Sequence, residues 1–384
     1  MKYILRFTIL VFLLCPLGVS AQESTMVNEQ RKELGFSAME RAVRQSEGLE
    51  EISPSFDFNA LVESLTSGEN IFSPKTILGS VLRVFSKEVY ENLHIMLTLI
   101  VLSIICAVAA NLQSSFQSKS VAEVAFFACY ILFVGILVRG FYTCVTLARG
   151  VISDQVVFLK AAVPTYVGLL MSCGSVSTAV TLEPLFLWFV QLIGSLIESI
   201  LLPFLFWISI LSMINNLSDK FHISNLIRFS RQLITWLLGI LLTFFVGILS
   251  LAGIGTSAAD GVGVKAMKYA VGNFIPVVGG LLSESVDTVM SSTVILKNSV
   301  GVAGVVVLIL ICAVPALELL ALIGMYKLTA SVIEPLSDKR IVELMNSAAS
   351  AVTYLFLMVV SVTLMFILSV AVVIGFGNLT HMIS

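Results

Sequence analysis

Two glutamates stand inside long apolar runs of this sequence, and their chemistry needs the most explanation. Glu198 lies in a run that covers 184–205, and Glu318 lies in one that covers 300–324. An ionised carboxylate near the middle of a bilayer costs about 2.5–3.5 kcal/mol on a lipid-facing helix. We therefore expect both side chains to face protein or water, to be protonated, or to pair with a cation, for which Lys160 is a candidate. A polar contact between helices and a cavity-lining or proton-coupled role would each satisfy this requirement.

No set of residues in the sequence predicts catalysis. The histidines His94, His222 and His381 are far apart in the chain, and no Ser/His/Asp set, phosphate-binding glycine loop or metal-ligand spacing is present. Most cysteines are scattered through apolar stretches without paired spacing, which is typical of small buried side chains. We expect a non-enzymatic protein without a cofactor or metal, so an ATP-driven step would need another subunit.

The elements that carry these residues are expected to be membrane helices. Of the 384 residues, 58% are hydrophobic and 12% are charged, against about 45–50% and 25% in ordinary soluble domains. This composition predicts an all-α polytopic membrane protein, and the formal net charge of −2 argues against nucleic acid as a partner. Six apolar runs are expected to cross the bilayer, at 95–112, 121–138, 184–205, 233–254, 300–324 and 350–375.

The distribution of Lys and Arg between these runs predicts the orientation of the helices. Basic residues occur at Lys119 and within 215–232 and 326–347, so we expect these connections to be cytoplasmic. The segment 255–299 and the tail after residue 375 then lie outside the cytoplasm. This places 255–299 on the same side of the membrane as the N-terminal segment.

The N-terminal part differs in composition from the rest. Residues 1–21 have the positive start, the apolar stretch and the small-residue cleavage site of a secretory signal peptide. We expect 22–92, which holds 12 of the 24 acidic residues, to be extracytoplasmic. The stretch 72–93 predicts an amphipathic helix that rests on the membrane or on its own domain, or that docks partners. Its expected apolar face consists of Leu78, Val81, Leu82, Phe85 and Val89.

An internal duplication is visible in the membrane part. "PTYVGLLMS" begins at Pro164 and "PVVGGLLSE" at Pro276, so that Gly168 aligns with Gly280, and "LSDK" follows each of them. Glu198 and Glu318 also correspond. Matches in the same order at nearly constant offset predict two parallel membrane repeats. The expected units are a signal peptide (1–21), an acidic helical segment (22–92), a first transmembrane helix with its turn (93–120), repeat 1 (121–232), repeat 2 (233–347) and a closing helix with the tail (348–384).

The Pro-Gly stretch of each repeat is unsuited to a plain crossing helix. The apolar run 269–282 has about 14 residues and contains Pro276, Gly279 and Gly280, whereas a crossing helix needs about 20 residues. We expect re-entrant or interfacial segments at Pro164–Gly168 and Pro276–Gly280. They would either line or brace a passage together with Glu198 and Glu318, or merely redirect the chain.

Beyond Gly280 the spacing predicts a helix with an acidic face. Glu284 and Asp287 lie on that face, opposite Leu282, Val286 and Val289. The two carboxylates would either meet extracytoplasmic water or dock a basic partner.

Several long motifs together resemble one protein family. They are "VPTYVGLLMSCGSVSTA" (163–179), "LPFLFWISILSMINNLSDKFHISNLIRF" (202–229), "DGVGVKAMKYAVGNFIPVVGGLLSESVDTVMSSTVILKNSVG" (260–301) and "GNLTHM" (377–382). This sequence resembles the stage III sporulation protein AE family over nearly its whole length. Members of that family often carry a basic residue where Gly280 and Glu318 stand, so the resemblance assigns Glu318 no family-wide role.

The resemblance implies a membrane subunit of the channel, or feeding tube, that links mother cell and forespore. It further implies the mother-cell membrane around the engulfed forespore as the location. The implied partners are other stage III A proteins, including an ATPase and ring-forming subunits, and the forespore stage II protein Q. A stand-alone secondary transporter for a small solute and a purely structural anchor for the ring proteins are the alternatives.

Overall fold

The protein is a bundle of long helices, seen in a computed structural model that describes residues 36–46, 57–67, 74–115, 119–215, 223–274 and 279–383. These ranges contain helices and short turns but no strand, as expected from the composition. The helices are α3 (Ser37–Arg44), α5 (Phe58–Ser67), α6 (Pro74–Ser115), α7 (Lys119–Ser172), α8 (Val176–Leu196), the π-helix η1 (Ile197–Leu201), α9 (Leu202–Asn215), α10 (Ser224–Phe274), α11 (Gly279–Ile333) and α12 (Lys339–Ile383).

Six of the helical segments are long and apolar enough to cross a membrane, which confirms the expected number of spans and a multi-pass membrane protein. They are Leu82–Val108, Phe126–Ser172, Val176–Asn215, Ser224–Ala252, Met290–Ile333 and Lys339–Gly375. Several helices are far longer than one crossing requires. The 54 residues of α7 extend over about 80 Å at 1.5 Å per residue, against a bilayer core of about 30 Å.

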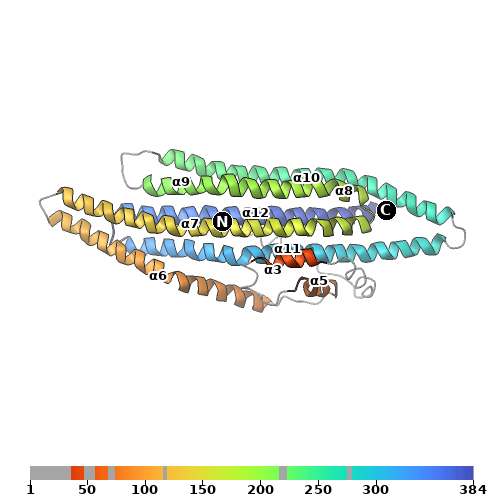
Figure 1. Cartoon of the computed structure of the whole chain (residues 1–384), viewed down its shortest axis with the longest axis horizontal. Helices are drawn as coiled ribbons and strands as arrows, with labels where there is room; N and C mark the ends of the chain where they lie inside the picture. Colours follow the sequence, from red (N-terminus) through yellow and green to blue (C-terminus); the bar gives the residue numbers. More distant parts are fainter. Residues whose placement is uncertain are drawn as a thin grey trace.

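The long helices run side by side with alternating direction (Figure 1). The α6–α7, α9–α10 and α11–α12 junctions lie toward one end of the bundle. The α7–α8 and α10–α11 junctions lie toward the other end, as does the C-terminus. This grouping is the one that the Lys and Arg distribution predicts, although the side that faces the cytoplasm stays a prediction. The helices α7 with α8–α9 and α10 with α11 form two hairpins in the same direction, while the internal duplication stays a prediction.

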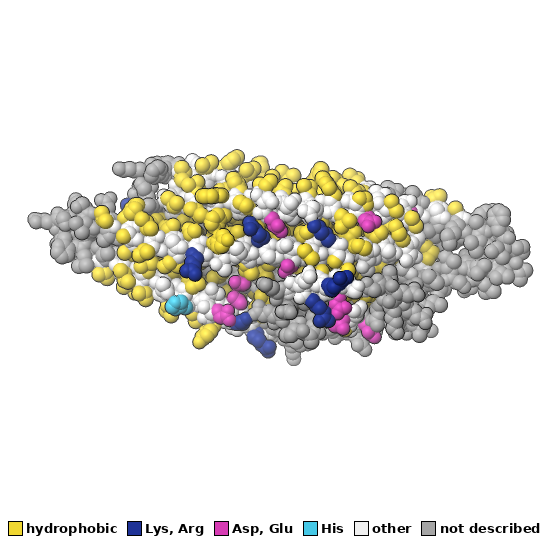
Figure 2. Space-filling model, in the orientation of Figure 1, with side chains coloured by type: hydrophobic (Ala, Val, Ile, Leu, Met, Phe, Trp, Pro, Cys, Tyr) yellow, Lys and Arg dark blue, Asp and Glu magenta, His cyan; other side chains and the backbone are white. Residues whose placement is uncertain are grey.

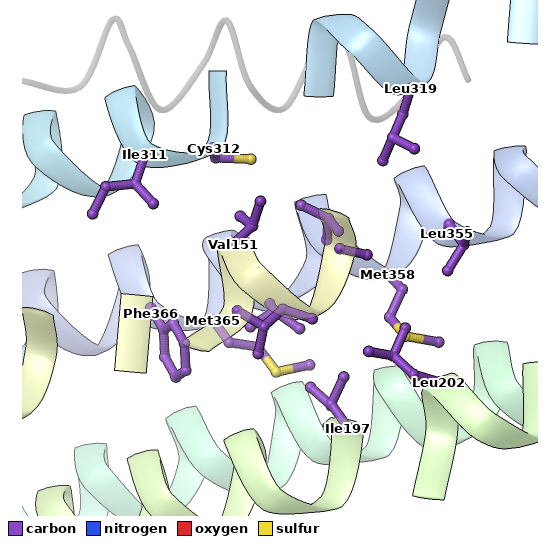
Figure 3. Packing of buried hydrophobic residues seen from close by; sticks show 14 of the residues in the cluster. Val151, Ile197, Leu202, Ile311, Cys312, Leu319, Leu355, Met358, Met365 and Phe366 are labelled. Carbon is purple, nitrogen blue, oxygen red and sulfur yellow. The ribbon is translucent and has the colours of Figure 1, made fainter. Parts of the chain in front are cut away.

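The helix α12 occupies the middle of the bundle and contacts α7, α9, α10 and α11. Its Leu355, Met358, Met365 and Phe366 are fully buried. Figure 3 shows these side chains among Val151 of α7, Ile197 of η1, Leu202 of α9, and Ile311 and Leu319 of α11. The centre of a single chain is therefore filled by packed apolar side chains.

The N-terminal helices dock on the bundle rather than forming a separate domain. The helix α3 packs against α7, and α5 packs against α11. The rings of Phe36 and Phe58 meet edge to face at 5.8 Å, and both belong to the main core. The segment thus adds to the apolar core despite its acidic composition.

The predicted amphipathic helix over 72–93 is the first half of α6, which continues without a break into the first span. The expected apolar face does not pack against the bundle at Leu82 and Phe85, and Val89 is half-buried, so its contact with the membrane or a partner stays a prediction. Leu82 is 58% exposed and Phe85 is exposed as well, whereas Val84 and Glu88 are buried. The reason is that α6 packs along α7 and α11, with Val84, Glu88 and Leu99 on its buried side.

The structure differs from the expected interruption at Pro164. The helix α7 passes through Pro164 and ends at Ser172, and the chain reverses at Gly174, whose φ of 79° suits glycine. Proline removes one hydrogen bond from the helix, which is a local loss that the surrounding helix tolerates here. Pro276 lies outside the described residues, and Gly279 and Gly280 form the first turn of α11.

Candidate functional site

The first pair of proposed passage residues lies near the end of α7 and away from the bundle axis. Pro164 is exposed, and Gly168 is half-buried one turn later. The carbonyl of Gly168 accepts a hydrogen bond from the hydroxyl of Ser172 at 2.9 Å. The axis is occupied by α12 instead, so this pair contributes to an outer surface of the single chain.

Glu198 lies in the π-helix η1, where it is half-buried. The wide turn has a local cause in the sequence. In an α-helix the N–H of Leu202 would bond to the carbonyl of Glu198, but here it bonds to the carbonyl of Ile197, five residues back. The next residue, Pro203, has no N–H to offer the carbonyl of Ser199. Turns of this kind inside α-helices are frequent at functional sites, and Pro203 is the signal by which the sequence could have indicated this one.

Glu318 is half-buried on α11 and lies near the thiol of Cys144 on α7. Lys160, the candidate cation, forms no ion pair with a carboxylate in the described part of the chain but donates a hydrogen bond to the side-chain oxygen of Gln191 on α8. Glu198 and Glu318 therefore sit in different environments, one at the junction of α8 with α9 and the other facing α7.

Three polar contacts between helices escaped prediction from the sequence. The Gln155 amide on α7 donates to the Thr363 hydroxyl on α12 at 2.7 Å, and both side chains are buried. The Lys297 ammonium on α11 donates to the carbonyl of Ile374 at 2.8 Å. The Tyr130 hydroxyl donates to the carbonyl of Met213 at 2.8 Å. Each of these polar residues stands in a mostly apolar run, which indicates a buried polar contact. The sequence does not show which residue is the partner.

A buried carboxylate holds the α7–α8 turn. Asp260 on α10 accepts hydrogen bonds from the backbone N–H groups of Ser177 and Thr178 at 2.8 and 2.9 Å, and from the Thr178 hydroxyl at 2.7 Å. The first N–H groups of a helix lack partners within the helix and attract negative charge. Asp260 therefore caps α8 from a neighbouring helix, a role that only the tertiary structure reveals.

Contacts between helices show which apolar runs lie at the same level of the bundle. Val156 of α7 packs against Gly194 of α8, while the neighbouring Gln155 bonds to Thr363 of α12. The rings of Phe189 and Phe245 meet at 5.2 Å. The expected spans 184–205, 233–254 and 350–375 are therefore side by side.

The part of α7 beside these spans is not its predicted run 121–138. Glu318 and Gly304 of α11 lie near Cys144 and Tyr166 of α7, respectively. By contrast, Phe126 lies under the guanidinium of Arg340, near the start of α12, with 5.8 Å from the guanidinium carbon to the ring centroid. The stretch of α7 from about residue 141 to 166 thus runs alongside the apolar cores of the other helices.

This stretch of α7 carries exposed basic side chains. Arg139, Arg149 and Lys160 are all exposed and are ten and eleven residues apart, which places them along one side of a helix. Among the residues that the structure describes, no carboxylate forms an ion pair with Arg139 or Arg149. We call the surface around Arg139, Arg149 and Lys160 the basic face.

At the same level, the surface of α9 and α10 is apolar. Trp236 is 72% exposed, Ile240 62% and Phe244 58%, and Phe244 neighbours the Phe245 ring that touches Phe189. Figure 2 shows charged side chains along the middle of the face that carries α7, below a rim that is mostly hydrophobic. The bundle therefore presents charged groups and large apolar groups on different sides of one cross-section.

Comparison with known proteins gives one consistent result. A family model described as "Stage III sporulation protein AE" matches residues 56–377. The chain is also 32% identical over 316 residues to the Stage III sporulation protein AE of Bacillus subtilis (strain 168), which covers 82% of this chain and 79% of that protein. No solved structure matches. The matched region includes all six candidate spans.

Proposed function

Because the chain belongs to the stage III sporulation protein AE family, we propose that it is a non-enzymatic membrane subunit of the sporulation channel between mother cell and forespore. In this role it is required for late development of the forespore. The observation that carries the proposal is the exposed basic face beside four apolar spans. Charged residues at membrane depth normally face protein or water and mark solute pathways. In a helix bundle surrounded only by lipid, this basic face would lie in an apolar environment, which is unfavourable.

The residues predicted to line or brace the passage keep that assignment as a proposal. They are Pro164, Gly168, Glu198, Pro276, Gly279, Gly280 and Glu318. Since packed side chains fill the centre of the single chain, a passage that these residues line lies between chains. The alternative of a stand-alone secondary transporter is not favoured, because such a protein needs a substrate site within its own bundle.

The proposed partners are the other stage III A proteins, including the ATPase and ring-forming subunits, and the forespore stage II protein Q. Glu284 and Asp287 are proposed to dock a basic surface of these partners. Both lie near the start of α11, at the end of the bundle where the α7–α8 turn and the C-terminus also lie. A basic partner would form ion pairs with these two carboxylates.

Deletion of the gene tests the proposed function. We expect vegetative growth to be unchanged and development to stop after the forespore is engulfed, so that heat-resistant spores fall to background. An intact copy at another locus should restore spores and serves as the control. A growth defect in vegetative medium together with normal spore formation would favour the transporter instead.

We propose a location in the mother-cell membrane with the N-terminal segment extracytoplasmic, and cysteine labelling tests this orientation. Single cysteines replace Ser67 at the end of α5 and Ser285 near the start of α11 in a chain without native cysteines. Both should react with an impermeant thiol reagent in intact vegetative cells that produce the protein in the cell membrane. A cysteine at Ser337, in the turn between α11 and α12, is the control and should react only after permeabilisation. Labelling of position 285 only after permeabilisation contradicts the proposed orientation.

A further inference from the structure

We propose that the basic face of α7 lines a water-filled passage, enclosed between copies of this chain, that accepts anionic solutes. This inference rests on the proposed function and names the substrate class. It starts from the unequal surfaces of the bundle, where Arg139, Arg149 and Lys160 are exposed on α7 while α9 and α10 expose large apolar side chains.

The first step is the position of the bilayer along the bundle. The expected spans in α8–α9, α10, α11 and α12 lie side by side through the contacts described above. The spans of α11 and α12 are the two most apolar of the six. The apolar groups exposed at this level include Ile240 and Phe244, and large exposed apolar patches are typical of surfaces that contact a membrane. The bilayer core therefore surrounds this level.

The second step is the environment of the basic face at that level. Arg149 lies between Phe141, which stacks on Phe206 at 5.9 Å, and Val156, which packs on Gly194. Lys160 lies level with Gln191, its hydrogen-bond partner. Guanidinium and ammonium groups in lipid are strongly disfavoured, and at membrane depth they face protein or a water-filled cavity. No carboxylate that the structure describes pairs with Arg139 or Arg149, and we place both groups in a water-filled cavity, one of the environments that this rule allows.

The length and the lining of the basic face suit a passage. From Arg139 to Lys160 the helix rises about 30 Å, which is the thickness of a bilayer core. The side chains between them on the exposed side are mostly small or polar. They include Thr143, Thr146 and Gly150, beside the larger Tyr142 and Val157.

The sign of the charge on the basic face determines which class of solute the passage accepts. Three basic side chains are exposed, whereas the carboxylates nearest in the sequence, Asp154 on α7 and Glu183 and Glu198 on α8 and η1, are half-buried. The exposed charged residues of α7 between positions 139 and 160 are therefore all basic. Rings of Arg and Lys side chains favour anions in pores, so we assign small anionic solutes as the substrate class.

A second copy of the chain supplies the opposite wall. One helix face cannot enclose water, and the interior of the single chain is packed. Copies arranged around an axis with α7 inward place their basic faces on a common passage and leave α9 and α10 toward lipid. Closed rotational symmetry of this kind is the usual arrangement of identical subunits.

Charged thiol reagents test the proposal in membranes isolated from sporulating cells, where the assembled complex is present and both sides are open. Full-length chains without native cysteines carry one cysteine at Thr146 or Val157 on the exposed side of α7, or at Ile240 or Phe244 on α10. The probes are the sulfonatoethyl and trimethylammonioethyl methanethiosulfonates, with rates normalised to a free thiol. Each variant must first restore spore formation.

The expected result is fast reaction at positions 146 and 157 and none at positions 240 and 244. The sulfonate should react at least about tenfold faster than the ammonium reagent, because a cleft lined by one sign of charge concentrates the opposite ion. Replacing both basic residues, Arg149→Gln with Lys160→Gln, should lower this ratio toward one. Arg228→Gln, at an exposed arginine near the start of α10, is the matched control and should leave the ratio unchanged.

Three results would overturn the inference. If positions 146 and 157 do not react, the face is covered and lines no water. If positions 240 and 244 react as fast as 146 and 157, this half of the bundle stands in water and the bilayer surrounds the α6–α7 hairpin instead. If the ratio does not respond to the double substitution, the face does not select anions. None of these results affects the deletion experiment, so failure here is distinguishable from failure of the proposed function.

Discussion

Replacing Gly304 with alanine should destabilise the protein by about 1–3 kcal/mol, the usual range for overpacking a filled core. Gly304 is buried on α11, and a Cβ at that position would overlap the hydroxyl oxygen of Tyr166 on α7. The Tyr166 ring is itself fully enclosed, so it cannot swing away into open space. We expect a lower unfolding midpoint in detergent and a lower level of the protein in membranes.

A second substitution identifies the cause of this loss. Tyr166→Phe removes the overlapping oxygen and leaves the ring carbon Cζ at 3.4 Å from the added Cβ, an ordinary contact. The hydroxyl has no hydrogen-bond partner among the described residues, so Tyr166→Phe alone should be close to neutral. Gly304→Ala combined with Tyr166→Phe should then recover most of the stability.

Gly135→Ala is the matched control, because a Cβ there meets nothing within 4 Å on the exposed side of α7. It should be neutral or slightly stabilising, since alanine favours the helix over glycine. Equal losses for Gly304→Ala with and without Tyr166→Phe would show that the contact with the hydroxyl is not the cause.

Replacing Asp260 with alanine should cost about 2–4 kcal/mol and loosen the end of the bundle that contains the α7–α8 turn. The carboxylate is buried and accepts three hydrogen bonds from the start of α8. Loss of a helix cap costs about 0.5–2 kcal/mol, and buried donors left without a partner add about 1–3 kcal/mol. The measurement is the unfolding midpoint in detergent, together with the rate of limited proteolysis within residues 172–176.

Two further variants separate the cap from a general effect on α10. Lys265→Ala, on the same helix but exposed, should leave both readouts unchanged. Thr178→Val removes one of the three donors and should give a smaller loss than Asp260→Ala. If Asp260→Ala changes neither the midpoint nor the proteolysis, α8 does not depend on this cap.

The number of membrane helices followed from the sequence, because crossing a bilayer requires a length of apolar helix that composition alone reveals. The alternation of the helices was also predictable, since the basic residues near Lys119, Arg228 and Arg340 mark connections at one end. The family was recognisable from collinear motifs such as 260–301. These features depend on local composition and order, and they need no knowledge of which side chains meet.

Predictions from the sequence failed where a local preference competes with packing between helices. Pro164 predicted a break, yet α7 continues through it to Ser172, because one missing hydrogen bond is a small loss within a helix of 54 residues that packs along most of its length. The side of α6 that packs on the bundle was not predictable either, since periodicity identifies an apolar side but not the side that contacts α7 and α11.

Only the tertiary structure decided how far each helix is shifted along its neighbours. That shift brings Arg149 and Lys160 beside apolar spans, joins Gln155 to Thr363 and seats Asp260 at the start of α8. It results from contacts between residues far apart in the chain, such as Gly194 with Val156 and Gly304 with Tyr166. The sequence shows which segments are apolar. The shift of each helix along its neighbours is determined by close packing between the helices.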